Sequence, residues 1–285
     1  MFMVFFISDK GRKFFKYFRR LMIEGKRIHN DRIKTKELSY TLPPKLHSAL
    51  FMLNMMIHKS LAGMLQDNDD TNLIISEVYK AIPSRKRKVS VVDVGMASNA
   101  LSFYTGLFSY LNDKFLKIQE ITIVDVNKDL VEYIKLDVID KLTDEHIKYS
   151  GLYKKDTVQI QRNRNPGTRV AKFPDIIVVE IYDNESKEKN QTPLEFNINS
   201  TEPFKMSANY KLDSAIIRDI SKKHFACVIT INGKEYGFDG ESYKRLSKFA
   251  WKNNLTKNKN WTFQGSNTRW NFRNGYQQLF YYRTK

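Results

Sequence analysis

The chain has 285 residues, of which 41% are apolar and 13% aromatic, and this content is enough to bury a substantial core in one large or two smaller domains. Its formal net charge of +17 at pH 7 favours a polyanionic partner, which is a nucleic acid, an anionic lipid or an acidic protein surface. The single cysteine, Cys227, excludes an internal disulfide framework and a cysteine-rich zinc site, and it suits the reducing cytoplasm or nucleus.

The first 22 residues combine a short apolar run with basic residues. The run, MFMVFFI, precedes its charges, which is the reverse of a secretory signal, and seven residues cannot span a bilayer. We therefore expect a soluble protein without a membrane span. Apolar residues then recur at helical spacing between lysines and arginines: Phe14, Phe15, Phe18, Leu21 and Met22. Two interpretations stay open, a helix that packs into the core and a helix that lies on a membrane surface.

Residues 39–82 predict two helices joined by a polar segment at 66–72. The first helix has a stripe of apolar residues at helical spacing, and such a methionine-rich stripe usually lies in a core. The stripe comprises Leu46, Leu50, Leu53, Met56 and, after a break, Leu61. His47 and His58 have no cysteine or carboxylate at ligand spacing, so we expect ordinary helix residues there and no metal site.

Residues 89–125 contain a pattern typical of a different class of protein. A buried-strand pattern at 89–94 leads to Gly95, and a second strand pattern ends at Asp125, 30 residues further on. An S-adenosylmethionine-dependent methyltransferase would place this glycine and this acid at its cofactor. The loop holds one glycine where several are wanted, so the methyltransferase stays an alternative. Parallel pairing of 89–94 with 121–125 would support it.

Residues 210–239 predict a β-hairpin. Residues 225–231 are mostly strand formers, and Asn232-Gly233 is a strong signal for a two-residue turn. His224 opens the first strand and Asp239 closes the second, so antiparallel pairing brings both residues to the same end of the hairpin. A histidine that a carboxylate orients can serve as a general base, as in a Cys-His-Asp arrangement. A surface hairpin that has no catalytic role would give the same pattern.

The C-terminal segment after Glu241 has no acidic residue. It contains ten lysines or arginines, three tryptophans and eight phenylalanines or tyrosines. Aromatic residues between cations can stack on unpaired bases, so nucleic-acid binding is possible. A hydrophobic final sheet with basic outward positions has the same composition, and we favour that interpretation.

The hairpin and its surroundings resemble the histidine box of the ubiquitin-specific proteases, which are papain-like deubiquitinases. The similar segments are Tyr210-x-Leu212-x-Ser214-x-Ile216, His224-Phe225, Tyr236-x-Phe238-Asp239 and GYQQLFYYR at 275–283. Residues 173–181 and 192–198 are similar to the strands that precede this box in the family. Residues 96–103 are similar to a further box, but its Gln, Asp and Glu are replaced by Ala97, Asn99 and Ser102.

The resemblance implies an α+β, papain-like ubiquitin-specific protease fold in a single domain, residues 1–285. Residues 1–116 would form an N-terminal helical thumb. Residues 117–285 would form the fingers and a C-terminal antiparallel β palm. The family often binds zinc in its fingers through two C-x-x-C pairs, which this sequence lacks, so the fingers would be metal-free and no cofactor is expected. The reaction of the family is isopeptide hydrolysis of ubiquitin conjugates, with His224 as base and Asp239 as its orienting carboxylate.

The nucleophile of the family is absent from this chain. Cys227 follows His224 by three residues on one strand, and strand alternation points the two side chains to opposite faces. Lys223 replaces the glycine before the family's histidine, and Gly240 replaces its second acid. Residues 4–18 are similar to the segment after the family's cysteine box, so the box would lie before Met1. Either the chain is a fragment of an active enzyme or it is a pseudoenzyme.

Three hypotheses therefore come from the sequence. The first is an inactive or truncated deubiquitinase-like protein of the cytoplasm or nucleus that binds ubiquitin, a ubiquitinated protein or an acidic partner. The second is the methyltransferase with Gly95 and Asp125 at its cofactor. The third is a basic nucleic-acid-binding module, whose affinity would depend strongly on salt.

Overall fold

The helices lie near the N-terminus of the chain in its structure, a computed structural model. The part of the chain that the structure describes comprises residues 2–31, 36–66, 69–82, 121–126, 147–148, 176–181, 194–199, 207–221, 224–240, 246–255, 257, 259–263, 267–272 and 276–284. Its α-helices are α1 (Phe2–Phe6), α2 (Gly11–Phe14), α3 (Lys16–Glu24), α4 (Pro44–Ala62) and α5 (Thr71–Ala81).

Local chemistry sets the ends of the two longest helices. Helix α4 begins at Pro44, whose fixed φ suits the first helical position, and it ends before Gly63, which has a left-handed φ of 66°. Helix α5 follows Asp70, whose carboxylate accepts a hydrogen bond of 2.8 Å from the N–H of Leu73. The polar segment expected at 66–72 thus ends in a helix cap.

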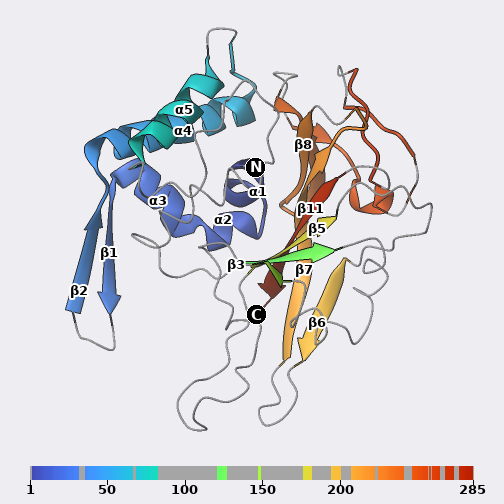
Figure 1. The fold of residues 1–285 in the computed structure, drawn as a ribbon, viewed down its shortest axis with the longest axis horizontal. Helices are drawn as coiled ribbons and strands as arrows, with labels where there is room; N and C mark the ends of the chain where they lie inside the picture. Colours follow the sequence, from blue (N-terminus) through green and yellow to red (C-terminus); the bar gives the residue numbers. More distant parts are fainter. Residues whose placement is uncertain are drawn as a thin grey trace.

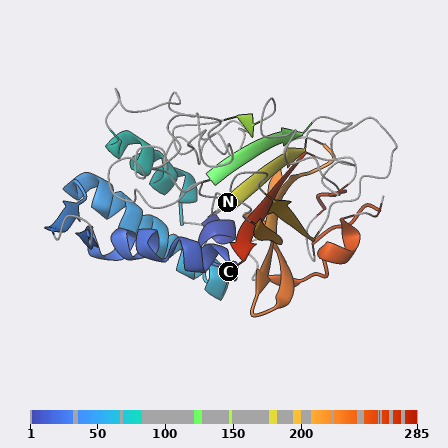
Figure 2. The ribbon, with the colours of Figure 1, turned by 90° about the horizontal axis from the view of Figure 1, so that it is seen from below.

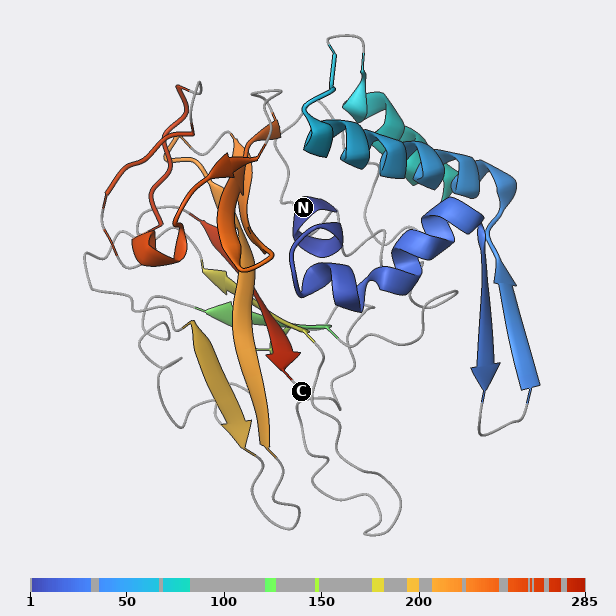
Figure 3. The same ribbon diagram turned by 180° about the vertical axis from the view of Figure 1, so that it is seen from behind.

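The strands form one hairpin and one large sheet among the described residues. The hairpin comprises β1 (Lys26–Asp31) and β2 (Lys36–Thr41), and it projects from the helices away from the large sheet (Figure 1 and Figure 3). The strands of the large sheet are β3 (Ile121–Val126), β4 (Ile147–Lys148), β5 (Ile176–Ile181), β6 (Glu195–Asn199), β7 (Ser207–Arg218), β8 (Phe225–Ile231), β9 (Lys234–Phe238), β10 (Ser247–Lys248) and β11 (Gln277–Thr284).

The order of the large sheet is β10-β9-β8-β7-β11-β5-β3-β4, with β6 paired to β7. The seven strands from β5 to β11 pair antiparallel with one another. Strand β3 instead runs parallel to β5, so one parallel pair adjoins the antiparallel sheet that was expected for the palm. A parallel pair needs a long crossover connection, and residues 127–175 supply that length. The described architecture is α+β, as the sequence predicted.

The helices cover one face of the large sheet, as Figure 1 and Figure 2 show from two directions. The core between the two layers contains apolar residues of α1, α3, α4 and α5 together with inward residues of the sheet. Those sheet residues include Ile176, Val178, Ile216, Cys227, Ile229 and Phe280. Phe5 lies at the centre, with its ring 4.7 Å from that of Phe15 and 5.1 Å from that of Phe280.

The opposite face of the sheet is covered by the C-terminal segment that precedes β11. Its core contains Trp251, Leu255, Phe263, Trp270 and Phe272, which pack on the other side of β7 and β8. Helix η6 (Lys252–Asn254) is a single 3-10 turn within this segment. The sheet therefore has an apolar core on each face.

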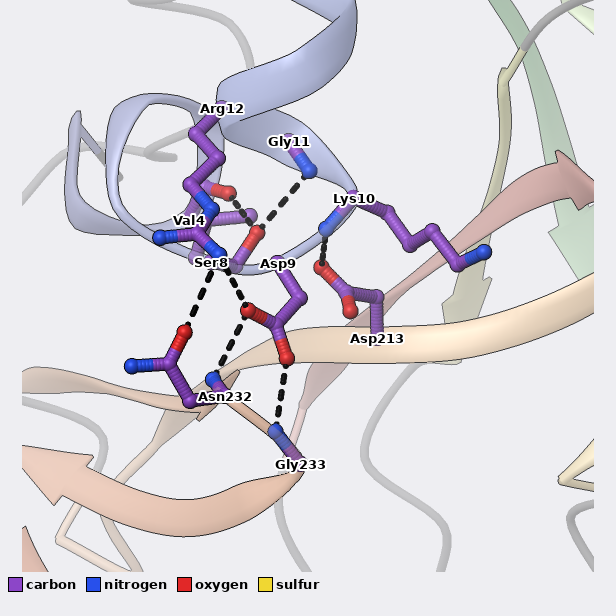
Figure 4. Close-up of polar contacts among 9 residues, drawn as sticks. All are labelled: Val4, Ser8, Asp9, Lys10, Gly11, Arg12, Asp213, Asn232 and Gly233. Atoms are coloured by element: carbon purple, nitrogen blue, oxygen red, sulfur yellow. Dashed lines mark hydrogen bonds and ion pairs between the residues drawn. The ribbon is translucent and has the colours of Figure 1, made fainter.

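The corner between α1 and α2 is hydrogen-bonded to the turn between β8 and β9 (Figure 4). The carboxylate of Asp9 accepts hydrogen bonds from the N–H groups of Asn232 at 2.8 Å and Gly233 at 2.9 Å. Arg12 lies 3.1 Å from both Asp9 Oδ1 and Asn232 Oδ1. The N–H of Lys10 donates to Asp213 Oδ2 at 3.0 Å. These contacts fix the helical layer on the β8–β9 turn and on β7.

The N-terminal helices bury the apolar faces that their periodicity predicts. Phe15, Phe18, Leu21 and Met22 are all buried, so this segment packs into the core and does not present an apolar face to a membrane. The stripe on α4 is also buried, from Leu46 to Met56. The β1–β2 hairpin was not expected within a helical thumb. No helix in the described part of the chain is long and apolar enough to cross a membrane.

Candidate functional site

The β8–β9 hairpin brings the two predicted site residues together. The pairing runs from Ile231 with Lys234 to Cys227 with Phe238, and it leaves Asn232 and Gly233 as the turn. Both turn residues have positive φ, at 49° and 74°, which is the geometry that the Asn-Gly signal predicts. His224 and Asp239 consequently lie at the end of the hairpin remote from its turn.

The imidazole of His224 is in hydrogen-bonding contact with the carboxylate of Asp239. His224 Nε2 lies 2.5 Å from Asp239 Oδ1, so the predicted approach of the two side chains is confirmed. The Asp239 side chain is 1% exposed and that of His224 is 19% exposed. A buried carboxylate that accepts the Nε2 proton selects one tautomer and directs Nδ1 away from the carboxylate. The partial exposure of the ring leaves room for a group to reach it.

An aromatic side chain forms one wall of this site. The ring of Trp270 lies 6.0 Å from that of His224, and Trp270 is fully buried. This ring excludes water from one side of the imidazole and so strengthens the contact between imidazole and carboxylate. The ring of Phe225 lies on the other face of the strand, against the helix-side core, where it packs edge-on against Tyr276 at 6.2 Å.

Cys227 lies in a different environment from His224. It belongs to the core on the helix side of the sheet, whereas its strand neighbours Ala226 and Val228 belong to the core that contains Trp270. The expected separation of the two side chains by strand alternation is confirmed. Burial raises the pKa of the Cys227 thiol to about 11, so at neutral pH it is neither ionised nor accessible.

Asp219 is a further residue of this site, and no functional motif in the sequence points to it. Its carboxylate accepts a hydrogen bond of 2.7 Å from the main-chain N–H of His224. The signal in the sequence is Asp219-x-Ser221, a spacing typical of a turn in which an aspartate caps the following N–H groups. That spacing occurs in many loops and gave no reason to connect Asp219 with the histidine.

The alternatives from the sequence gain no support from the described residues. The strand expected at 121–125 is present as β3, but residues 89–95 lie outside the described part, as do Ala97, Asn99 and Ser102. Of the part expected to form the fingers and palm, residues 127–146 and 149–175 also lie outside it. Within the described part, no group of three or more histidine, cysteine or acidic residues could hold a metal ion.

The aromatic residues of the C-terminal segment are mostly internal. Trp251, Trp270, Phe263 and Phe272 are buried, and the rings of Trp261 and Trp270 stack on each other at 5.5 Å. The main chains of these two tryptophans exchange two hydrogen bonds of 2.9 Å. Because these rings fill a core, they are not available to stack on bases, and the hydrophobic final sheet accounts for the composition.

Comparisons with known proteins found a structural similarity but no match in sequence. No protein-family model matches the chain, and no curated protein matches it. Among solved structures, the chain is similar to a chain of the SAGA Ubp8/Sgf11/Sus1/Sgf73 DUB module, with a TM-score of 0.44 and 12% sequence identity. The match covers 94% of this chain and 64% of that chain. Similarity at this level does not assign the chain to a family.

Proposed function

We propose that the chain is an inactive or truncated protein similar to the ubiquitin-specific proteases, which by itself binds ubiquitin or a ubiquitinated protein without hydrolysing the conjugate. In this proposal residues 1–285 form one domain, with a helical thumb-like part at 1–116 and a fingers- and palm-like β part at 117–285. His224 corresponds to the family's base and Asp239 to its orienting carboxylate. The single buried thiol suits the reducing cytoplasm or nucleus.

The contact between His224 and Asp239 carries the proposal. Two residues 15 positions apart in the sequence meet at 2.5 Å, with the carboxylate buried and the imidazole partly exposed. A base in a Cys-His-Asp site needs this arrangement, because the carboxylate must hold the ring while the other nitrogen serves the nucleophile. The family's strand motifs before and after the hairpin, quoted above, support the same assignment.

The missing step is nucleophilic attack. Isopeptide hydrolysis in this family needs a thiolate that adds to the scissile carbonyl, and the histidine then protonates the leaving amine. Cys227 is the only thiol of this sequence, and it is buried on the opposite face of the sheet from His224. Within this sequence the pair can hold a proton at the imidazole but has no thiolate to activate, so the function proposed for the chain by itself is binding.

Activity assays on the recombinant chain test the loss of hydrolysis. Incubation with ubiquitin-aminomethylcoumarin and with ubiquitin vinyl sulfone should give neither fluorescence nor a covalent adduct. An active ubiquitin-specific protease under the same conditions is the positive control. A signal that disappears in Cys227→Ser would show that Cys227 reaches the substrate and would overturn the assignment. A signal that disappears in His224→Ala but persists in Cys227→Ser would point to a nucleophile other than Cys227.

Binding is tested separately with the same protein. Titration of labelled monoubiquitin should give saturable binding, and a ubiquitin whose C-terminal tail is removed should bind no more tightly. No detectable binding of monoubiquitin or of a ubiquitin conjugate up to about 1 mM, a binding free energy of about −4 kcal/mol, would refute the proposal.

A further inference from the structure

The loop that carries His224 joins β7 to β8, and Asp219 is its first residue. The N–H of Asp219 donates to the carbonyl of His224 at 2.8 Å, which extends the ladder beyond the pair of Arg218 and Phe225. The carboxylate of Asp219 accepts the N–H of His224 at 2.7 Å. It also accepts the N–H of Ser221 at 3.0 Å and the hydroxyl of the same serine.

This set of contacts fixes the main chain on both sides of the loop. Asp219 is 2% exposed, so its carboxylate depends on donors from the protein in place of water. Bonds from N–H groups to a carboxylate are stronger than those to a carbonyl, particularly away from solvent. The main-chain direction at His224, and hence the direction of its Cα–Cβ bond, is therefore held by the Asp219 carboxylate.

A second contact ties the same loop to the aromatic wall of the site. The N–H of Ile220 donates to the carbonyl of Arg269 at 3.0 Å, and the next residue, Trp270, has its ring 6.0 Å from the His224 ring. Displacement of the loop would therefore move the imidazole relative to both the indole and the Asp239 carboxylate.

We infer that Asp219 is a positioning residue for His224. Its carboxylate holds the main chain of the loop so that the imidazole meets Asp239. Asp219 acts through the backbone, whereas Asp239 acts on the ring. The inference concerns the pair on which the proposed function rests, but it makes a claim about the position of the imidazole that holds whether or not the protein binds ubiquitin.

The hairpin offers a matched control at its other end. Asp9 also uses its carboxylate to accept two main-chain N–H groups, those of Asn232 and Gly233. Asp9→Ala therefore removes the same kind of cap from the same hairpin, remote from the histidine. A general loss of stability would follow from either variant, but only the loss of Asp219 should change the imidazole.

The readout is the state of the His224 ring, measured by nitrogen-15 and proton NMR of the full chain. The sequence contains five histidines, and the His224→Gln variant identifies the resonances of interest. The wild type should show one tautomer with a proton on Nε2, shifted downfield by the short contact with Asp239 and slow to exchange with water. Asp239→Asn provides the spectrum of a ring that has lost its carboxylate.

In Asp219→Ala the downfield Nε2 proton should be lost and the two tautomers should be mixed. Asp219→Asn, which keeps one acceptor oxygen, should retain part of the signal, and Asp9→Ala should retain all of it. An unchanged Nε2 proton in Asp219→Ala would overturn the inference, as would an equal loss in Asp9→Ala. If Asp219→Ala does not fold, Ser221→Ala together with Asp219→Asn decides the matter: an unchanged proton in both would overturn it.

The two proposals fail separately. A protein that keeps this dependence on Asp219 but does not bind ubiquitin refutes the proposed function alone. If the protein binds ubiquitin but the Nε2 proton of His224 is unchanged in Asp219→Ala, the positioning role alone is refuted.

Discussion

At the scale of single residues, burial determines what the ionisable groups of this chain can do. Cys227 pairs with Phe238, the residue before Asp239, and its thiol lies in the core on the helix side of the sheet. The thiol is surrounded by apolar groups, whereas the carboxylate has an imidazole as its partner. The same hairpin therefore contains an inert thiol and a paired acid.

Cys227 should resist thiol reagents in the native protein. Its pKa of about 11 leaves a thiolate fraction at pH 8 roughly a hundredfold below that of an ordinary cysteine, and burial slows access further. Mass spectrometry after treatment with iodoacetamide should find the native thiol unmodified and the thiol in guanidinium fully alkylated. Rapid labelling of the native protein, at a rate that matches a free thiol, would show that the core around Cys227 opens.

Asp213 should make the protein less stable as the pH rises. Burial raises the pKa of this carboxyl above its usual range, although donors from Ser8, Lys10 and Gly11 act in the opposite direction. Below about pH 4 the group is protonated in both the folded and unfolded states, so its favourable contribution is complete there. As the pH rises through the folded-state pKa, the folded chain must ionise a buried acid and that contribution is lost.

Asp213→Asn tests this directly. The variant should have a higher Tm than the wild type at pH 7, and the difference should disappear below about pH 4. Glu24→Gln, at an exposed ion pair with Arg20, is the control and should change Tm little at either pH. A variant that is destabilised equally at both pH values would show that the hydrogen bonds of the carboxylate outweigh its burial.

At the scale of elements, the corner between α1 and α2 joins the helical layer to the β8–β9 hairpin. The carboxylate of Asp9 accepts hydrogen bonds from two N–H groups of the turn, and the N–H of Asp9 donates a hydrogen bond of 2.8 Å to the carbonyl of Thr230. We call these contacts of Asp9 the joint. The same turn sets the register in which Cys227 pairs with Phe238, and the side chains of His224 and Asp239 meet beyond the end of this pairing. The joint and the site are therefore two ends of one hairpin.

Asp9→Ala should lower the free energy of unfolding by about 1–3 kcal/mol, because it removes a charged acceptor from two main-chain N–H groups. Asp9→Asn should lose about half as much, since one acceptor oxygen remains. Urea unfolding followed by tryptophan fluorescence measures both. The control is Glu24→Ala, whose exposed pair with Arg20 should contribute less than about 0.5 kcal/mol. Equal losses in Asp9→Ala and Glu24→Ala would show that the joint contributes no more than a surface ion pair.

At the scale of the whole molecule, charge acts against tight binding of ubiquitin. The chain has 48 basic and 31 acidic residues, which gives the net charge of +17. Ubiquitin is nearly neutral overall and has a basic face, so it gains no long-range attraction to this surface. A broad interface of about 1,200–2,000 Å² could still give specific binding.

We therefore expect a Kd for monoubiquitin in the micromolar range or weaker, measured by calorimetry at about 0.15 M salt, where charges are screened beyond about 8 Å. A polyglutamate peptide should bind more tightly at low salt and lose affinity as salt is added, as an acidic partner would. Sub-micromolar binding of ubiquitin would show that specific contacts override the charge. Salt-independent binding of polyglutamate would contradict the electrostatic argument.

The sequence by itself determined the elements whose signals are local. The Asn-Gly turn and the alternation around it predicted the hairpin, the meeting of His224 with Asp239 and the opposite orientation of Cys227. Helical periodicity predicted α4 and α5, and the buried faces of α3 and α4. Periodicity and turn geometry depend on neighbouring residues, so they can be read without knowledge of the rest of the chain.

Only the tertiary structure decided the features that depend on segments far apart in the sequence. The β1–β2 hairpin, the parallel pairing of β3 with β5, and the roles of Asp9 and Asp219 had no unambiguous local signal. The aromatic C-terminal segment had two possible environments, and its burial against β7 and β8 chose between them. An aspartate that caps a main-chain N–H looks the same in sequence wherever that N–H lies, because the partner is selected by packing of the whole chain.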